Sequence, residues 1–418
     1  MVARMKLYYF TNSYPFGMSM LWKPHELEVF KKYCKEITVI PFSFWGNSEA
    51  KNVLEGIHYR QPLFPEQPYV SIRQRLFTVL FSRHIGLFAK QFFSHRVFLN
   101  KAKFISWILD SYTIHLLTKH PVIKELLAAA DEDTIWYFYW ARHSSLIIPL
   151  LKKKNVKICC RFHGYDLYEE RNKGRYVGYQ DEQVKAADLL MPCSQHGSDY
   201  LAKKYPSVRD KIFIARLGSQ FKAVSGINND GVLRIVSCAT VRPVKRLHLL
   251  AQALQYVKSQ VMWVHIGGGP DYEQLKQQAE AINRPNVQVS FTGNMPGSEI
   301  IDFYVQSRFD LFVNVSESEG VPVSVMEAFS AGIPVYATNV GGTGEIVDES
   351  VGKLLPPDLS PQFLAQCLDE FAALPLEKKE IFRNNAIQRF RDRCDAARNA
   401  ELLIQEIEQR LLPAEPVQ

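Results

Sequence analysis

The sequence lacks the features by which membrane-spanning and disulfide-rich proteins are identified. No apolar run approaches the ~18 residues that a membrane span needs. The seven cysteines include no C-x-x-C pair and lie mostly within apolar runs, which argues against a disulfide framework and a zinc site. The stretch that precedes Asn12 is too short for a secretion signal, so we expect a cytoplasmic protein.

Composition and length indicate a globular protein with two domains. Of the 418 residues, 47% are hydrophobic and 22% are charged, which excludes disorder as the main state. The chain exceeds the ~100–200 residues of an ordinary domain. A formal net charge of +7 suits phosphate-bearing ligands, anionic membrane surfaces or nucleic acid. Because no RNA-binding signature accompanies the charge, we expect no nucleic-acid partner.

Short apolar runs alternate with amphipathic stretches, and this βαβα pattern predicts parallel sheets covered by helices. The first half holds expected strands at 6–10, 36–41, 135–139, 157–161, 188–192 and 212–215. A stretch with several glycines and asparagines at 218–231 interrupts the pattern and predicts a linker. Expected strands resume at 234–238, 261–266, 287–291, 311–315, 334–337 and 352–355. We therefore predict an α/β fold with Rossmann-like domains at 1–220 and 232–390.

A basic, aromatic stretch stands out in the first half. Residues 67–109 contain seven lysines or arginines and no acidic residue. Phenylalanine or isoleucine recurs at 77, 81, 85, 88 and 92, a spacing that indicates one face of a helix. A basic helix with such an apolar stripe is typical of the membrane interface. Two interpretations of the segment 70–107 stay open: it binds an anionic membrane surface, or it packs on the first domain.

An acidic, glycine-containing string follows the predicted strand at 311–315. It begins Ser316-Glu317-Ser318-Glu319-Gly320-Val321-Pro322 and reaches Glu327 five residues later. Proline suits the first turn of a helix, so we expect a helix to start near Pro322. The free N–H groups and positive end of that helix form an anion site that fits a diphosphate. The Glu327 carboxylate can accept hydrogen bonds from vicinal hydroxyls such as those of a ribose.

Two further loops follow predicted strands of the second half. The loop Ala239-Thr240-Val241-Arg242-Pro243-Val244-Lys245-Arg246 places a lysine where its three donors can reach diphosphate oxygens. The loop Ile266-Gly267-Gly268-Gly269-Pro270 lets the backbone approach a nucleotide. It is not the dinucleotide fingerprint G-x-G-x-x-G, because Tyr272 occupies the position of the last glycine.

Together these loops resemble the retaining glycosyltransferases of the GT-B fold, family 4 (glycosyltransferase group 1). Glu319 and Glu327 hold the two glutamates of the frame E-G-x-P-x-x-x-x-E, and Lys245 matches the phosphate lysine. The resemblance implies that Glu319 lies near the donor sugar and that Glu327 binds the donor ribose. Further donor-binding residues implied are Gly267, Gly268, Gly320, Val321 and Pro322. Thr240 departs from the family's arginine, and Arg242 is expected to supply that charge.

The resemblance extends to the first half through two loops. Arg161-Phe162-His163-Gly164-Tyr165-Asp166 is similar to the family's H-G, which implies a catalytic His163 and an acceptor-side Asp166. Gly17 matches the donor-binding glycine loop after the first strand, without its usual second glycine. The segment 391–418 is implied to cross back and pack on the first domain. We interpret Asp131-Glu132-Asp133 as a turn and expect no metal site.

The resemblance implies that a sugar moves from a UDP- or GDP-sugar to an acceptor hydroxyl with retention of configuration. No cofactor or metal is implied. The implied acceptor is a sugar or a lipid-linked polysaccharide or lipopolysaccharide intermediate, at the inner face of the cytoplasmic membrane. Three alternatives stay open: a nucleotide-sugar epimerase of the same fold, an NAD-dependent oxidoreductase without its glycine fingerprint, and a non-catalytic, membrane-associated nucleotide-sugar-binding protein.

Overall fold

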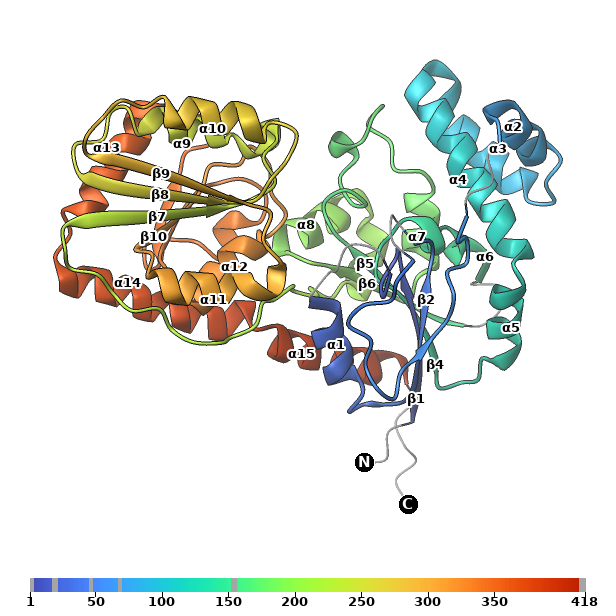
Figure 1. Ribbon diagram of the computed structural model, residues 1–418. Helices are drawn as coiled ribbons and strands as arrows, with labels where there is room; N and C mark the ends of the chain where they lie inside the picture. Colours follow the sequence, from blue (N-terminus) through green and yellow to red (C-terminus); the bar gives the residue numbers. More distant parts are fainter. Residues whose placement is uncertain (1–3, 17–21, 45–47, 67–69, 152–155, 413–418) are drawn as a thin grey trace. The chain divides into compact units, whose positions relative to one another are not determined.

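The computed structural model describes residues 4–16, 22–44, 48–66, 70–151 and 156–412 (Figure 1). The chain forms two compact units. Unit 1 comprises residues 1–215 and 400–418, and unit 2 comprises residues 216–399. Each unit is an α/β layer structure around its own parallel sheet, as the alternation of elements predicts.

Unit 1 contains a six-stranded parallel sheet in the order β3-β2-β1-β4-β5-β6. The strands are β1 (Met5–Thr11), β2 (Cys34–Pro41), β3 (His58–Tyr59), β4 (Thr134–Phe138), β5 (Lys157–Phe162) and β6 (Leu189–Pro192). Every residue of β4 is buried, because both faces of the sheet are covered. Trp136 and Phe138 enter one hydrophobic core, and Ile135 and Tyr137 enter the other. Polar residues are thereby confined to the loops that follow the strands.

The helices of unit 1 fill the connections between these strands. They are α1 (Trp22–Phe30), α2 (Ile72–Leu80), α3 (Ile85–Ser94), α4 (Lys101–Lys119), α5 (Pro121–Ala129), α6 (Ile148–Leu151), α7 (Gln180–Ala186) and α8 (Gln195–Lys204), with short 3₁₀ turns η1 (Val97–Leu99), η2 (His143–Ile147), η4 (Glu169–Arg171) and η5 (Pro206–Lys211). Asn100 caps α4 by accepting the amides of Ala102 and Lys103. Ser194 caps α8 in the same way, with Gly197 N as the donor.

Unit 2 repeats this architecture with the strand order β12-β11-β10-β7-β8-β9. The strands are β7 (Val232–Cys238), β8 (Gln260–Ile266), β9 (Val287–Gly293), β10 (Leu311–Asn314), β11 (Val335–Thr338) and β12 (Gly352–Leu355). The helices are α9 (Leu247–Ala253), α10 (Tyr272–Glu280), α11 (Gly297–Ser307), α12 (Val323–Ser330), α13 (Pro361–Ala372) and α14 (Leu376–Arg389), with short turns η6 (Pro243–Lys245), η7 (Thr343–Glu345) and η8 (Phe390–Cys394). The order reverses between β10 and β7, so the loops after these two strands meet at one edge of the sheet.

The last helix, α15 (Ala396–Leu411), belongs to unit 1 from Ala400 onward. Leu403, Ile404 and Ile407 are buried in the same core as Leu7 and Tyr9 of β1. The closing segment therefore packs on the first domain, as the sequence predicts. No helix in the described part of the chain is long and apolar enough to cross a membrane.

Two predicted elements are wrong. The strand expected at 212–215 is reduced to one isolated bridge between Ile212 and Leu190. The segment still runs beside β6, because the backbone N–H groups of Phe213 and Ala215 donate to the carbonyls of Leu190 and Pro192, both at 2.9 Å. The carbonyl of Ala215 accepts a hydrogen bond from the Arg161 guanidinium instead of a strand partner, at 2.9 Å. The single helix expected through 77–92 is divided into α2 and α3. The buried Ser82 interrupts it, because its hydroxyl bonds the backbone N–H of His84 and lies 3.0 Å from the His115 ring nitrogen Nδ1.

Division of that helix changes which aromatic rings are covered. Phe88 is fully buried, and Phe92 packs against the same core. Phe77 and Phe81 keep 64% and 75% of their surface exposed, and their ring centroids are 4.5 Å apart. The packing interpretation therefore applies to α3, whereas the end of α2 presents two apolar rings to solvent.

Candidate active site

The carboxyl edge of the unit 2 sheet brings together Lys245 and Glu319, although 74 positions separate them in the sequence. Lys245 ends the turn η6 after β7, and its Nζ donates to Oε1 of Glu319 at 2.6 Å. Asn314, the last residue of β10, donates its side-chain amide to the same oxygen at 3.2 Å. Since the Glu319 side chain is only 10% exposed, this lysine is held in one place by a desolvated ion pair.

Arg246 anchors the η6 loop to the end of β10. Its guanidinium donates to the carbonyls of Val315, Ser316 and Pro357. These bonds fix the backbone on either side of Lys245, so Arg246 is a positioning residue. Arg242 is exposed, and its guanidinium has no ion pair within the described residues. It is thus available for the ligand charge that the sequence assigns to it.

The glycines of the β8 loop are required by a close backbone approach. Gly267 and Gly269 both have positive φ, at 129° and 153°. A Cβ on Gly267 would lie 2.1 Å from the carbonyl of Ala239, and one on Gly269 would lie 2.3 Å from that of Val241. A hydrogen bond joins the loop after β7 to the loop after β8: the backbone N–H of Val241 donates to the carbonyl of Gly268 at 2.8 Å. Asn294 Oδ1 accepts the N–H of Gly268, a contact that the sequence did not indicate.

The helix α12 begins without a side-chain cap. Pro322 occupies its N-cap position and contributes no side-chain hydrogen bond, so this end leaves backbone donors for a ligand. The preceding turn is closed by the glycine pair at 341–342, because a Cβ on Gly341 would lie 2.0 Å from the carbonyl of Glu319. Gly320 itself has open space around its Cα. Val321 is buried beneath the turn.

Glu327 lies on α12 with its carboxylate unused. It makes no hydrogen bond within the described part of the chain, and burial raises its pKa to about 8. Because this half-buried carboxylate receives no hydrogen bond from the protein, a ligand that donates one would bind favourably here. Vicinal hydroxyls of a sugar or ribose would supply two such donors.

In unit 1, His163 directly follows β5 and is enclosed by aromatic rings. Its ring centroid is 3.9 Å from that of Trp140 and 5.2 Å from that of Tyr139. Burial alone would lower the pKa of His163, but Cys193 and Asp166 raise it to about 9. The side chain is 11% exposed, and neither ring nitrogen has a hydrogen-bond partner among the described residues. This imidazole is therefore poised to donate to a ligand.

Asp166 is fully buried beside His163. One carboxylate oxygen accepts the N–H of His163 at 2.6 Å, and the other accepts the N–H of Ala141 at 2.9 Å. The same second oxygen is 3.5 Å from Nδ1 of His163. With no exposed oxygen left for an acceptor, the geometry gives Asp166 a positioning role behind His163.

Sequence reasoning assigned no role to Glu26. Glu26 is buried and pairs with the Arg161 guanidinium. The hydroxyls of Tyr9 and Tyr137 also donate to it, at 2.8 and 3.2 Å. The available signal was Arg161 itself, since a charge within the apolar run of β5 requires a buried partner.

Three further expectations concern Gly17, a metal site and the turn at Asp131. Gly17 lies outside the described residues. The described ranges contain no group of three or more histidine, cysteine, aspartate or glutamate side chains that could hold a metal ion. Asp131 forms a turn between α5 and β4, where it accepts the Thr134 hydroxyl and the Asp133 N–H, as predicted.

Comparison with solved structures defines the class of fold as GT-B. The crystal structure of Anabaena Alr3699/HepE in complex with UDP superposes with a TM-score of 0.67, covering 97% of this chain and 100% of that chain at 15% identity. The likeness covers both units and confirms the predicted two-domain α/β architecture. At this identity it concerns the fold alone.

Sequence comparison then finds a family match within unit 2. Residues 220–389 match the family described as "Glycosyl transferases group 1". The amylovoran biosynthesis glycosyltransferase AmsK of Erwinia amylovora is 27% identical over 53% of this chain and 56% of its own length. The O-antigen biosynthesis glycosyltransferase WbnH of Escherichia coli is 36% identical over 25% of this chain and 28% of its own length. The chain thus spans less than two thirds of the length of each of these curated relatives.

Proposed function

We propose that the protein transfers a sugar from a UDP- or GDP-sugar to an acceptor hydroxyl, with retention of configuration. The observation that carries the proposal is the unpartnered Glu327 carboxylate on the same sheet edge as the Lys245–Glu319 pair. A nucleotide-sugar supplies what each group lacks: hydroxyl donors for Glu327 and a diphosphate for Lys245. The family match of unit 2 supports this assignment.

Each residue of the unit 2 edge has a proposed role in that reaction. Lys245, Arg242 and the uncapped end of α12 stabilise the charge that develops on the departing diphosphate. Glu319 positions the donor sugar, and Glu327 holds the ribose. The backbone at Gly267 and Gly268 lets the nucleotide approach closely. His163 is the proposed catalytic residue of unit 1.

We propose that the transfer needs no metal, since Lys245 and Arg242 supply positive charge for the diphosphate. The proposed acceptor is a sugar or lipid-linked intermediate of polysaccharide or lipopolysaccharide assembly. The named activities of the relatives, amylovoran and O-antigen biosynthesis, support this class. A nucleotide-sugar epimerase is the second candidate, because it would use the same donor contacts without an acceptor.

Thermal unfolding with a ligand panel tests the donor assignment. We expect UDP-sugars or GDP-sugars to raise the melting temperature in the presence of chelator, with no response to NAD. A ligand at a hundred times its Kd adds about 2.7 kcal/mol to the free energy of unfolding, enough for a clear shift. A response that requires metal, or one limited to NAD, would overturn the proposal. Conversion of the sugar without any acceptor would favour the epimerase.

The pH dependence of the same binding isolates Glu327. With its pKa raised to about 8, the carboxyl is mostly protonated at pH 7 in the free protein. Ribose hydroxyls donate to the ionised form, so binding releases a proton. Affinity for the nucleotide-sugar should therefore rise from pH 6 to about pH 8, by at most about tenfold per unit, and then level off. The Glu327→Gln variant should bind more weakly and lose this slope; a slope that survives would contradict the ribose contact.

We further propose that the exposed end of α2 binds an anionic membrane surface. Phe77 and Phe81 are exposed, and the segment that contains them carries no acidic residue. The double variant Phe77→Ser/Phe81→Ser should bind vesicles containing phosphatidylglycerol at least tenfold more weakly in a sedimentation assay, because burial of each ring contributes about 1.5–3 kcal/mol. Phe363→Ser, at a partly exposed phenylalanine of unit 2, should bind as the natural protein does. Equal binding by all three proteins would exclude this surface.

A further inference from the structure

Unit 1 contains a cavity that the proposed chemistry does not use. Its volume is about 490 Å³. Its lining comes from two segments of the chain, 94–103 at the junction of α3 and α4, and 169–176 in the connection after β5. The lining residues are Ser94, His95, Arg96, Leu99, Asn100, Lys103, Glu169, Arg175 and Tyr176. None of them belongs to the residues assigned above to the donor or to catalysis.

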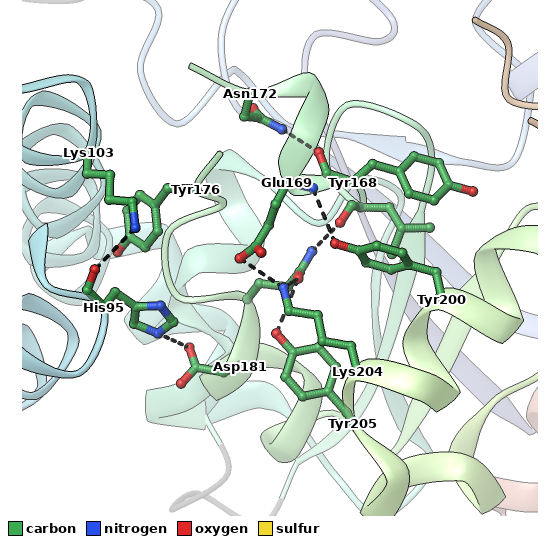
Figure 2. A network of polar contacts seen from close by, with 12 residues as sticks. His95, Lys103, Tyr168, Glu169, Asn172, Tyr176, Asp181, Tyr200, Lys204 and Tyr205 are labelled. Carbon is green, nitrogen blue, oxygen red and sulfur yellow. Dashed lines mark hydrogen bonds and ion pairs between the residues drawn. The ribbon is translucent and has the colours of Figure 1, made fainter. Parts of the chain in front are cut away.

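The cavity carries uncompensated positive charge. The acidic side chains around it are already paired, Glu169 with Lys204 at 2.9 Å and Asp181 with His95 at 3.5 Å (Figure 2). Arg96 and Arg175 form no ion pair with any described residue. The one carboxylate in the lining, Glu169, is paired with Lys204, so the two arginines have no carboxylate partner of their own. Two such guanidinium groups favour an anionic ligand, and their fork geometry matches phosphate oxygens.

Lys103 is a third cation in the cavity, and it contacts both segments that carry the arginines. Lys103 donates to the carbonyl of His95 at 3.3 Å and lies 5.9 Å from the centroid of the Tyr176 ring (Figure 2). The first contact uses one of its three donors, so the others remain for a ligand. Gly174 lets the β5 loop approach closely, since a Cβ there would lie 3.2 Å from the backbone nitrogen of Lys103.

The backbone at both arginines is unusual. Arg96 has φ 48° and Arg175 has φ 51°, in the left-handed region that long side chains seldom adopt. Among the seven non-glycine residues with positive φ in the described ranges, these two are charged, exposed and line the same cavity. Strain of this kind is typically retained where it aims a side chain at a ligand.

Apolar surface continues from the cavity rim. Leu99 lines the cavity and is 68% exposed, and its neighbour Phe98 is 56% exposed. Phe93, one residue before the cavity segment begins at Ser94, is 66% exposed. A ligand that fits both surfaces has a phosphate group and an alkyl chain.

We infer that this cavity binds the phosphate group of a phosphorylated lipid. Arg96, Lys103 and Arg175 contact the phosphate, and Leu99 with Phe98 contacts the start of the chain. For a transferase with a lipid-linked acceptor, this phosphate is the acceptor's own. To that extent the inference rests on the proposed function.

Calorimetry with dioctanoyl phosphatidic acid, kept below its micelle concentration, tests the site without any donor present. Glycerol 3-phosphate and inorganic phosphate serve as chain-free probes. We expect the natural protein to bind the lipid at least tenfold more tightly than either chain-free probe. The variant Arg96→Asn/Arg175→Asn should weaken lipid binding at least tenfold, and Asn tolerates the left-handed backbone. The double variant Arg73→Asn/Arg209→Asn, an equal charge change at two exposed arginines of unit 1 outside the cavity, should bind within twofold of the natural protein.

The results separate this inference from the proposed function. Equal affinity for lipid and glycerol 3-phosphate would overturn the lipid assignment, and an equal loss in the Arg73/Arg209 variant would overturn the site. If the Arg96/Arg175 double variant has a lowered melting temperature, Lys103→Gln provides the second test, and we expect it to weaken lipid binding threefold or more. All pocket variants should keep the natural thermal response to nucleotide-sugar. Absence of that response in the natural protein, with lipid binding intact, would contradict only the donor proposal.

Discussion

Glu319→Ala is expected to lower kcat by about 10²–10³-fold while changing the Kd of the nucleotide-sugar by less than fivefold. The reason is the contact at 2.6 Å between Glu319 and Lys245. Without the carboxylate, the lysine loses its orienting partner and the transferred sugar loses the group proposed to position it. An interaction made mainly in the transition state changes kcat more than binding.

The measurement compares steady-state release of nucleotide with calorimetric binding of the same donor. Glu317→Ala is the matched control, because Glu317 lies two residues earlier in the same loop and is exposed. It should retain kcat within twofold. Glu327→Ala should instead affect binding more than turnover: we expect the Kd of the nucleotide-sugar to rise at least tenfold and kcat to fall by a smaller factor. Natural kinetics in both the Glu319 and Glu327 variants would eliminate the assigned motif.

Arg161→Met is expected to lower the free energy of unfolding of unit 1 by about 3–5 kcal/mol. Arg161 is 1% exposed and pairs with Glu26, whose carboxylate would be left buried without its cation. The substitution also removes donors to Tyr137 Oη and the carbonyl of Ala215. The loss comes mainly from an uncompensated buried charge rather than from the value of the pair itself.

Chemical denaturation followed by tryptophan fluorescence measures this loss, with Trp136 as a probe in β4 of the same sheet. The control is Arg60→Met, which breaks the Arg60–Glu125 pair, whose side chains are 41% and 54% exposed. That change should cost less than about 1 kcal/mol, because solvent screens an exposed pair. If both variants lose the same stability, the buried network does not support the fold as argued.

The sequence predicted the sheets and the unit 2 loops because both depend on local signals. Continuous apolar runs define buried parallel strands such as β4, and glycines mark the backbone approach at Gly267. Sequence spacing alone does not show that Lys245 and Glu319 touch. Their contact follows from the strand order, which places β7 beside β10.

The failures of prediction have tertiary causes. The Phe stripe from 77 to 92 has helical spacing, yet the buried Ser82 and its partner His115 on α4 divide it. Glu26 resembles a surface acid until the fold places Arg161 beside it. The cavity at Arg96 and Arg175 joins segments almost eighty positions apart, and neither carries a recognisable motif. The periodicity of apolar residues does not indicate any of these three arrangements, because each depends on residues that are distant in the sequence.

The membership of α15 in unit 1 has a consequence for biosynthesis. Leu403, Ile404 and Ile407 complete the core around β1, but the ribosome makes them only after all of unit 2, residues 216–399. At ~5–20 residues per second, that delay amounts to roughly ten to forty seconds. During this interval the apolar surface of β1 and its neighbours that α15 later covers stays open. Unit 2 is one continuous range of the sequence and needs no later segment to complete its core, so the nascent first sheet is the part of this protein that chaperones would protect.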